Sequence, residues 1–138
     1  MAYDPNNVFA KILRGDAPCF VVHEDAATLA FMDIMPQADG HVLVIPKVAA
    51  ESLLDLPDEA ARACIVAVKR VAAAVRKALQ APGITVVQMS GAAAGQTVPH
   101  CHFHVIPRGP GFADRPHGQQ REQDHKLQAL ALQIQACM

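Results

Sequence analysis

Hydrophobic and polar positions along the chain change their period several times, and each change predicts a different element. Short β-branched or alternating stretches, closed by turn residues, are typical of strands. Five such stretches occur, at 20–24, 28–32, 41–45, 84–89 and 100–107. Only the residues 25–27 separate the first two stretches, which predicts a hairpin.

Between the third and fourth stretches the apolar period lengthens to that of a helix. Pro57 suits a first helical position, two acidic residues follow it, and Pro82-Gly83 ends the pattern. We therefore expect a helix from about residue 57 to residue 81. Its expected buried face is Cys64, Ile65, Val68, Val71, Val75 and Leu79.

A second apolar period, from Leu127 to Ile134, predicts a C-terminal helix after an irregular segment that begins at residue 109. Most of the predicted strands follow one another through short links, which favours antiparallel pairing. The sequence therefore predicts an α+β fold with a five-stranded antiparallel sheet and two main helices. We expect one domain over residues 1–138, because this length is typical of a single domain.

The amino-acid composition limits which binding partners and which cellular location we expect. Hydrophobic residues make up 51% of the chain and charged residues 18%, which excludes a disordered protein. The formal net charge of -1 argues against nucleic acid or an anionic membrane as a partner. No apolar run reaches the ~18–20 residues of a membrane span, and the N-terminus does not resemble a signal peptide. Four cysteines form no Cys-x-x-Cys motif, so we expect free thiols and a cytoplasmic location.

The seven histidines are a surplus for this length, and three of them alternate at positions 100, 102 and 104. Side chains of a strand alternate between its two faces, so these three imidazoles share one face, about 6.5–7 Å apart. The residues that alternate with them, Cys101, Phe103 and Val105, point the other way and can fill a core. One face of this stretch packs, while the other displays three imidazoles.

Three interpretations of this face compete. In the simplest interpretation this is a solvent-exposed polar face. Exposed strand faces usually mix residue types, however, which argues against three histidines in a row. Three imidazoles could also hold Zn²⁺ with an open fourth position. The third is a nucleophilic or acid–base cluster, in which at least one ring stays neutral because adjacent imidazoles cannot all be charged at low cost. Small residues at 91–97 precede the histidines and can offer backbone N–H groups to an anion, which favours histidine chemistry at a phosphorus centre.

The segment His100-Cys101-His102-Phe103-His104-Val105-Ile106 resembles the signature of the histidine triad family, in which histidines alternate with apolar residues. The resemblance extends over roughly residues 6–108. It includes 7–16, 31–36, 40–47 and the Gly95-Gln96-Thr97-Val98 run before the triad, in the order of the family's bacterial branch.

This resemblance implies a homodimer that hydrolyses substrates at the α-phosphorus of a purine nucleotide. The implied substrates are nucleoside phosphoramidates of the adenosine 5′-phosphoramidate type, or dinucleoside polyphosphates. The middle histidine of the family is the nucleophile, which assigns a covalent nucleotidyl intermediate to His102. No cofactor or metal is implied for this step, and the partner is an AMP-like nucleotide.

The resemblance also implies roles for other residues. His104 would bind a phosphate oxygen, and His100 with His41 would form a hydrogen-bonded relay behind His102. The implied nucleotide-binding residues are Phe31 and Ile34 at the base, Asp33 at the ribose, and Met89, Gly95, Gln96 and Thr97 at the phosphate end. Without the resemblance, Asp33 would be a plain turn residue and His41 a core or cap residue. His23, His117 and His125 have no motif context, and we expect them on the surface.

Two departures from the family's pattern matter. Many members hold a structural zinc with two N-terminal cysteines and a later histidine, whereas Asn7, Ala10 and Ala49 stand here, so we expect no zinc. Met89 replaces the usual Asn or Gln, and a thioether cannot donate a hydrogen bond. The leading hypothesis is a phosphoramidate hydrolase. A dinucleoside polyphosphate hydrolase and a nucleotide-binding regulatory protein with weak turnover are the alternatives.

Overall fold

The computed structural model describes residues 3–138, so the first two residues of the predicted domain lie outside the described part. The described residues form three α-helices, five strands and one short 3-10 turn. They are α1 (Val8–Leu13), β1 (Val21–Glu24), β2 (Thr28–Met32), β3 (Val42–Pro46), α2 (Asp58–Leu79), β4 (Gly83–Gln88), a 3-10 turn η1 (Ala92–Ala94), β5 (Phe103–Arg108) and α3 (Asp124–Gln135). The predicted fold class is confirmed, with α1 as a short third helix.

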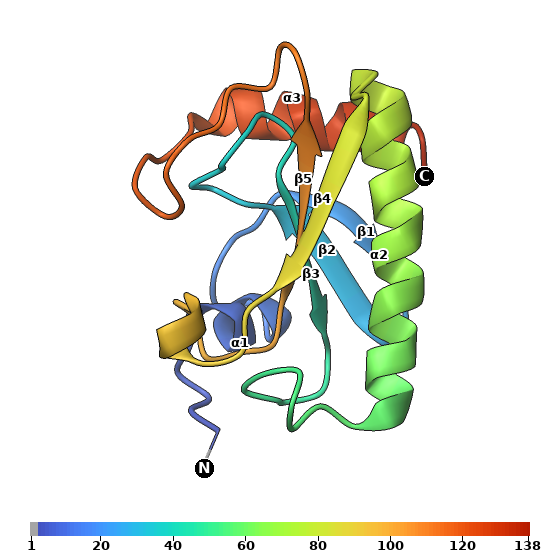
Figure 1. Ribbon diagram of the computed structural model, residues 1–138. Coiled ribbons are helices and arrows are strands. Elements are labelled where there is room, and N and C mark those ends of the chain that lie inside the picture. Colours follow the sequence, from blue (N-terminus) through green and yellow to red (C-terminus); the bar gives the residue numbers. More distant parts are fainter. Residues whose placement is uncertain (1–2) are drawn as a thin grey trace.

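The strands form one five-stranded sheet in the order β1-β2-β3-β5-β4. Every neighbouring pair is antiparallel, as the short links between the strands predicted. β5 therefore lies between β3 and β4, and β4 is an edge strand. Figure 1 shows the sheet nearly edge-on, with α2 along one side of it and α1 on the other.

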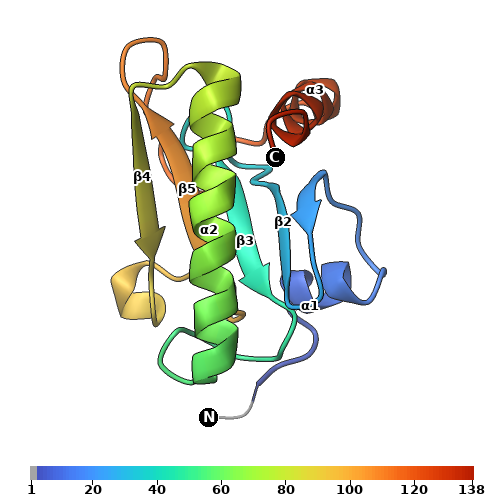
Figure 2. The same ribbon diagram turned by 90° about the vertical axis from the view of Figure 1, so that its right-hand side faces the viewer.

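The main core lies between the sheet and α2, which crosses the sheet in Figure 2. α2 contributes buried residues at helical spacing, and the strands contribute inward-facing side chains such as Val44 and Val105. Removing this apolar surface from water stabilises the fold by roughly 25 cal/mol per Å². One residue of the predicted helix face lies elsewhere: Ile65 is 54% exposed, although the sequence pattern placed it inside.

A smaller core lies on the opposite face of the sheet. Phe9 of α1 packs there with Phe31 of β2 and with Leu43 and Ile45 of β3. All five residues of β2 and of β3 are buried, because both faces of these strands are covered. Asn7 caps α1 by accepting a hydrogen bond from the backbone N–H of Ala10, at 2.8 Å.

The predicted strand 100–107 begins later than expected, at Phe103. The backbone carbonyl of His100 accepts a hydrogen bond from the His102 ring, and the N–H of Cys101 donates to the carbonyl of Ala50. Those backbone groups are therefore not available to the neighbouring strands. The alternation continues through this run nevertheless, because Cys101 joins the main core together with Phe103 and Val105.

Among residues 3–138, no helix combines the length and the apolar character that crossing a membrane requires.

Candidate active site

A cavity of about 250 Å³ opens on the face of the sheet that lies away from α2. α1 forms one wall, and the ends of β2 and β5 with the loops beside them form the others. Six of the residues singled out in the sequence line it, namely Phe31, Asp33, Ile34, Thr97, His102 and His104. His41 and His100 are fully buried directly behind this wall.

The triad residues face this cavity side, as the alternation predicted. The ring centroids of His102 and His104 lie 5.0 Å apart, and Phe9 of α1 meets the His102 ring edge-to-face at 5.0 Å. Phe9 also meets His100, at 6.4 Å. α1 thus supplies an aromatic wall against which two of the three imidazoles are packed.

Hydrogen bonding fixes which nitrogen of His102 carries the proton. Its Nδ1 lies 2.7 Å from the backbone carbonyl of His100, and a carbonyl can only accept. Nδ1 must therefore donate, and in the neutral ring Nε2 keeps its lone pair. His102 lines the cavity and is only 4% exposed, so this lone pair belongs to a largely desolvated nucleophilic nitrogen.

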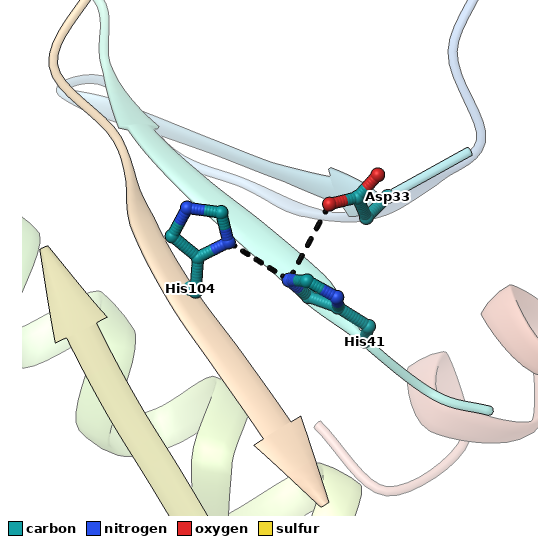
Figure 3. Close-up of side chains that lie close together, drawn as sticks. All are labelled: Asp33, His41 and His104. Carbon is teal, nitrogen blue, oxygen red and sulfur yellow. Dashed lines mark hydrogen bonds and ion pairs between the residues drawn. The ribbon is translucent and has the colours of Figure 1, made fainter. Parts of the chain in front are cut away.

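The same reasoning orders a second pair of rings. The backbone N–H of Gln37 donates to Nδ1 of His41 at 2.9 Å, so the His41 proton sits on Nε2. That Nε2 lies 2.9 Å from Nδ1 of His104, which must accept. Figure 3 shows His41 between His104 and Asp33. The neutral His104 ring therefore carries its own proton on Nε2.

Nε2 of His104 is buried and has no hydrogen-bond partner among the described residues. Buried N–H groups are nearly always paired, since leaving one unpaired costs about 1–3 kcal/mol. This ring also lines the cavity next to His102. The site thus presents one nucleophilic nitrogen and, beside it, one preorganised hydrogen-bond donor.

Burial keeps these rings neutral. It lowers the pKa of His41 to about 2 and that of His104 to about 3, with the neighbouring histidines adding to both effects. Burial also lowers the pKa of His102 and of His100. Near neutral pH the triad therefore consists of uncharged imidazoles, which is the form in which a histidine can act as a nucleophile.

Asp33 lies at the end of β2 and lines the same cavity. One of its carboxylate oxygens accepts the backbone N–H of Met35, and the other lies 3.4 Å from Nε2 of His41. Burial raises the pKa of Asp33 to about 6. Because His41 is neutral, this contact is a weak N–H···O interaction and not an ion pair.

The expected relay between His100 and His41 is wrong. Nε2 of His100 donates to the carbonyl of Pro46 at 2.9 Å, and its Nδ1 accepts the hydroxyl of Tyr3 at 2.5 Å. His41 meets His104 instead. The physical reason is register: β3 pairs Leu43 with His104, which brings His41 beside the third triad residue and not the first.

The loop before the triad is organised by Gln96. Its amide oxygen accepts the N–H of Gly91, and its amide nitrogen donates to the carbonyls of Glu51 and Val98. The N–H groups of Ala94, Gly95 and Gln96 are all used within the turn. Met89 packs under this turn, so close that a Cβ on Gly95 would lie 2.9 Å from its sulfur. Of the four predicted phosphate-end residues only Thr97 lines the cavity, and nucleotide contacts by Met89, Gly95 and Gln96 stay predictions.

The side chains do not fit a metal ion well. Asp33, His41 and His104 offer atoms within 4.8 Å of one another, but Nε2 of His41 carries a proton and is no ligand. A family-type zinc site would use His100, whose two nitrogens are both hydrogen-bonded, and Asn7, whose amide caps α1 and donates to Tyr3. Neither set of residues provides the free donor atoms that Zn²⁺ requires.

Three residues of the site were missed in the sequence. Tyr3 orients His100, Phe9 packs on the triad, and His117 lies with its ring centroid 5.2 Å from that of His104. The expectation that His117 is an incidental surface residue is therefore wrong, since it is half-buried and lines the cavity. Tyr3 is the only tyrosine of the chain, which was the one available signal. His117 follows an irregular segment whose path no periodicity predicts.

A five-stranded antiparallel sheet with three alternating histidines on one face, two of which line a cavity, is typical of the class of histidine-triad proteins. The sequence model of the HIT domain family matches residues 14–111, and the chain belongs to this family. A HIT-like protein from Bartonella henselae of known structure is 47% identical, with a TM-score of 0.93 over 100% of both chains.

Two relatives carry names that state an activity. Adenosine 5′-monophosphoramidase hnt1 of Schizosaccharomyces pombe is 43% identical over 101 residues, which cover 73% of each chain. Adenylylsulfatase HINT3 of Arabidopsis thaliana is 34% identical over 131 residues, which cover 95% of this chain and 66% of the relative.

Proposed function

We propose that the protein hydrolyses purine nucleoside phosphoramidates, of the adenosine 5′-phosphoramidate type, at the α-phosphorus. One observation carries the proposal: a nitrogen with its lone pair on His102 and an unpartnered N–H donor on His104 belong to neighbouring rings that line one cavity. Attack at phosphorus needs a nucleophile and a donor for the charge that develops on the phosphoryl oxygens. The names of the two relatives support an adenylyl compound as substrate.

In the proposed reaction, the lone pair of His102 Nε2 forms a bond to phosphorus and the bond to the leaving group breaks. The Nε2–H of His104 stabilises the phosphoryl oxygen, held in place by His41 behind it. Water then displaces the nucleotide from His102. The carbonyl of His100 stabilises the positive charge that the His102 ring carries in the intermediate, because it accepts from Nδ1.

The apolar end of the cavity suits a purine. Phe31 and Ile34 line it, and Ile34 is 40% exposed at its mouth. Asp33 lies between this end and the triad, where its carboxylate can accept hydrogen bonds from ribose hydroxyls. Thr97 also lines the cavity, where its hydroxyl would contact the phosphate. Together these side chains would accommodate the base, the ribose and the phosphate of an AMP-like ligand.

Turnover of three substrates tests the proposal: adenosine 5′-phosphoramidate, adenylyl sulfate and a diadenosine polyphosphate. We expect the phosphoramidate to react fastest, and His102→Ala to lose on the order of 10⁴-fold or more of the rate. His125→Ala, which changes an exposed histidine on α3, serves as the matched control. Faster cleavage of the polyphosphate would make a dinucleoside polyphosphate hydrolase the better description. Equal rates for wild type and His102→Ala on all three substrates would leave a nucleotide-binding regulatory protein.

The remaining expectations accompany this proposal. The chemistry uses only histidines and water, so we propose that it needs neither a metal nor an organic cofactor, and neither nucleic acid nor a membrane. All four cysteines are free, which supports the cytoplasm as the location. Residues 1–138 would act as one domain within a homodimer, whose interface we assign to exposed apolar residues on α2 and β4.

A further inference from the structure

The segment 109–123 is irregular, yet it is fastened along the loop that follows β2. The backbone N–H of Arg115 donates to the carbonyl of Gln37 at 2.7 Å, and the N–H of Glu122 donates to the carbonyl of Ile34 at 2.8 Å. Figure 1 shows this segment, which we call the strap, running beside the loop on the side of the sheet opposite α2. The strap therefore lies at the edge of the histidine cavity.

Charged side chains hold the strap in addition. Arg115 contacts Asp39 at 2.5 Å and Glu122 at 3.3 Å, and Lys126 of α3 contacts the same two carboxylates. These groups are partly buried and form a network, whereas a single exposed ion pair contributes little. These contacts fix the position of the strap, and therefore also the positions of its side chains relative to the cavity.

The side chain that the strap delivers to the cavity is His117. Its ring meets that of His104 edge-to-face, with centroids 5.2 Å apart, and lines the cavity. Nδ1 of His117 lies 3.1 Å from the amide nitrogen of Gln37, whose amide oxygen faces the guanidinium of Arg108 at 3.4 Å. The strap and the loop together thus orient the ring by one of its nitrogens, which leaves Nε2 for the cavity.

His104 is the common neighbour of His102 and His117. Its ring centroid lies 5.0 Å from that of His102 and 5.2 Å from that of His117, and all three rings line the cavity. Displacement at phosphorus places the attacking and leaving groups roughly in line on opposite sides. If His102 attacks and His104 binds the phosphoryl oxygen, His117 is the remaining histidine of the cavity that can meet the leaving group.

A departing amine needs a proton, and the other rings are poor sources of one. Burial lowers the pKa of His41, His102 and His104, so these rings are neutral near neutral pH. His117 is half-buried. The titratable groups near it are His102, His104 and His41, with Asp33 in the lining of the same cavity and Arg108 on the far side of Gln37. In the observed contact Nδ1 accepts from the amide nitrogen of Gln37. Protonation of Nδ1 requires this amide to turn, so that its oxygen leaves Arg108 and accepts from Nδ1.

We propose that His117 is the general acid of this site, which gives its Nε2 proton to the nitrogen of the leaving amine. This inference rests on the proposed function and extends it, because it assigns the leaving-group end of the cavity to the strap. His117 would be a catalytic residue and not an incidental surface histidine.

The proton balance is simple. As the His102–phosphorus bond forms, the phosphorus–nitrogen bond of the substrate breaks and its electron pair stays on the amine. The amine takes the proton from Nε2 of His117, and the imidazolium becomes neutral. In the second step the neutral His117 removes a proton from water as the oxygen–phosphorus bond forms, and the electron pair of the His102–phosphorus bond returns to His102. Each turnover thus restores both histidines.

The test compares two leaving groups on the full-length protein: ammonia from adenosine 5′-phosphoramidate, and fluoride from adenosine 5′-phosphorofluoridate, which departs without a proton. We expect His117→Ala and His117→Gln to lower kcat for the phosphoramidate about 100-fold, the size typical of a general acid. For the fluoridate we expect a change of less than about 3-fold. In wild type, kcat for the phosphoramidate should fall at alkaline pH, because a general acid must carry its proton. In both His117 variants this alkaline fall should be absent. His125→Ala is the control, with thermal unfolding of every variant measured alongside.

Three outcomes would overturn the role of His117. Equal losses on both substrates would indicate a binding or structural role, no loss on either would remove the residue from the mechanism, and rescue by Gln would reduce it to a hydrogen-bond donor. All three require wild-type turnover. If wild type cleaves neither substrate, the proposed function itself fails, and this result is distinct from the other three.

Discussion

At the scale of single residues, the site is defined by which nitrogen of each ring carries a proton. Two backbone carbonyls, which can only accept, settle this for His100 and His102, and one backbone N–H, which can only donate, settles it for His41 and through it for His104. The sequence predicted that three histidines share a face, because a strand has a period of two. It could not predict the hydrogen-bond partners, since these come from distant residues such as Gln37 and Pro46.

Tyr3 is the residue whose role is simplest to test. Its hydroxyl donates to Nδ1 of His100 and accepts from the amide of Asn7. Tyr3→Phe would leave a buried imidazole nitrogen without a donor, at a cost of about 1–3 kcal/mol in the free energy of unfolding. Urea denaturation measures this cost, with Asn6→Ala at the neighbouring exposed position as the control. An unchanged midpoint for Tyr3→Phe would show that this hydrogen bond is not formed.

At the scale of elements, periodicity predicted the helices and strands well because each buries one or two faces. The exceptions have local causes. β5 starts at Phe103 because the carbonyl of His100 accepts from a side chain, and α1 has only 6 residues, which is too few for an apolar period to predict a helix. The path of the strap could not be predicted, because its sequence has no hydrophobic period. Its position also depends on hydrogen bonds to the loop after β2 between residues about 80 positions apart.

The outer face of α2 gives a prediction at this scale. Ile65 and Val66 of α2 and Val86 of the edge strand β4 are 54%, 49% and 45% exposed, and the two elements pack against each other. If this face forms the homodimer interface, Ile65→Asp should place an unpaired charge in it and yield monomers. Sedimentation velocity checks the result, and Leu132→Asp, at an equally exposed position of α3, should leave the dimer intact. A wild-type protein that sediments as a monomer would refute the assignment.

At the scale of the whole molecule, the histidine site links stability to pH. Unfolded histidines titrate near pH 6.5, whereas burial lowers the pKa of His41 to about 2 and of His104 to about 3 in the fold. Below about pH 6.5 the unfolded state therefore binds more protons, and stability falls as pH falls. Asp33 acts in the opposite direction between about pH 4 and pH 6, because burial raises its pKa to about 6. The two histidines outweigh this one carboxyl.

We therefore expect the free energy of unfolding to decrease by about 1.4 kcal/mol per pH unit or more as the pH is lowered from about 6 to about 4. Urea denaturation across this range measures the slope. His41→Asn removes one of the buried rings and should make the slope shallower, whereas His125→Ala should not change it. A stability that is constant over this range would contradict neutral, buried rings.

The central claim is that His102 becomes covalently bound to the nucleotide. Wild-type protein mixed with adenosine 5′-phosphoramidate, quenched in alkali within milliseconds and digested, can be read by mass spectrometry at the peptide that contains residues 100–104. We expect one adenylyl group on His102, formed and lost during turnover and absent from His102→Ala. Turnover without any adduct, or an adduct on His100 or His104 in its place, would contradict it.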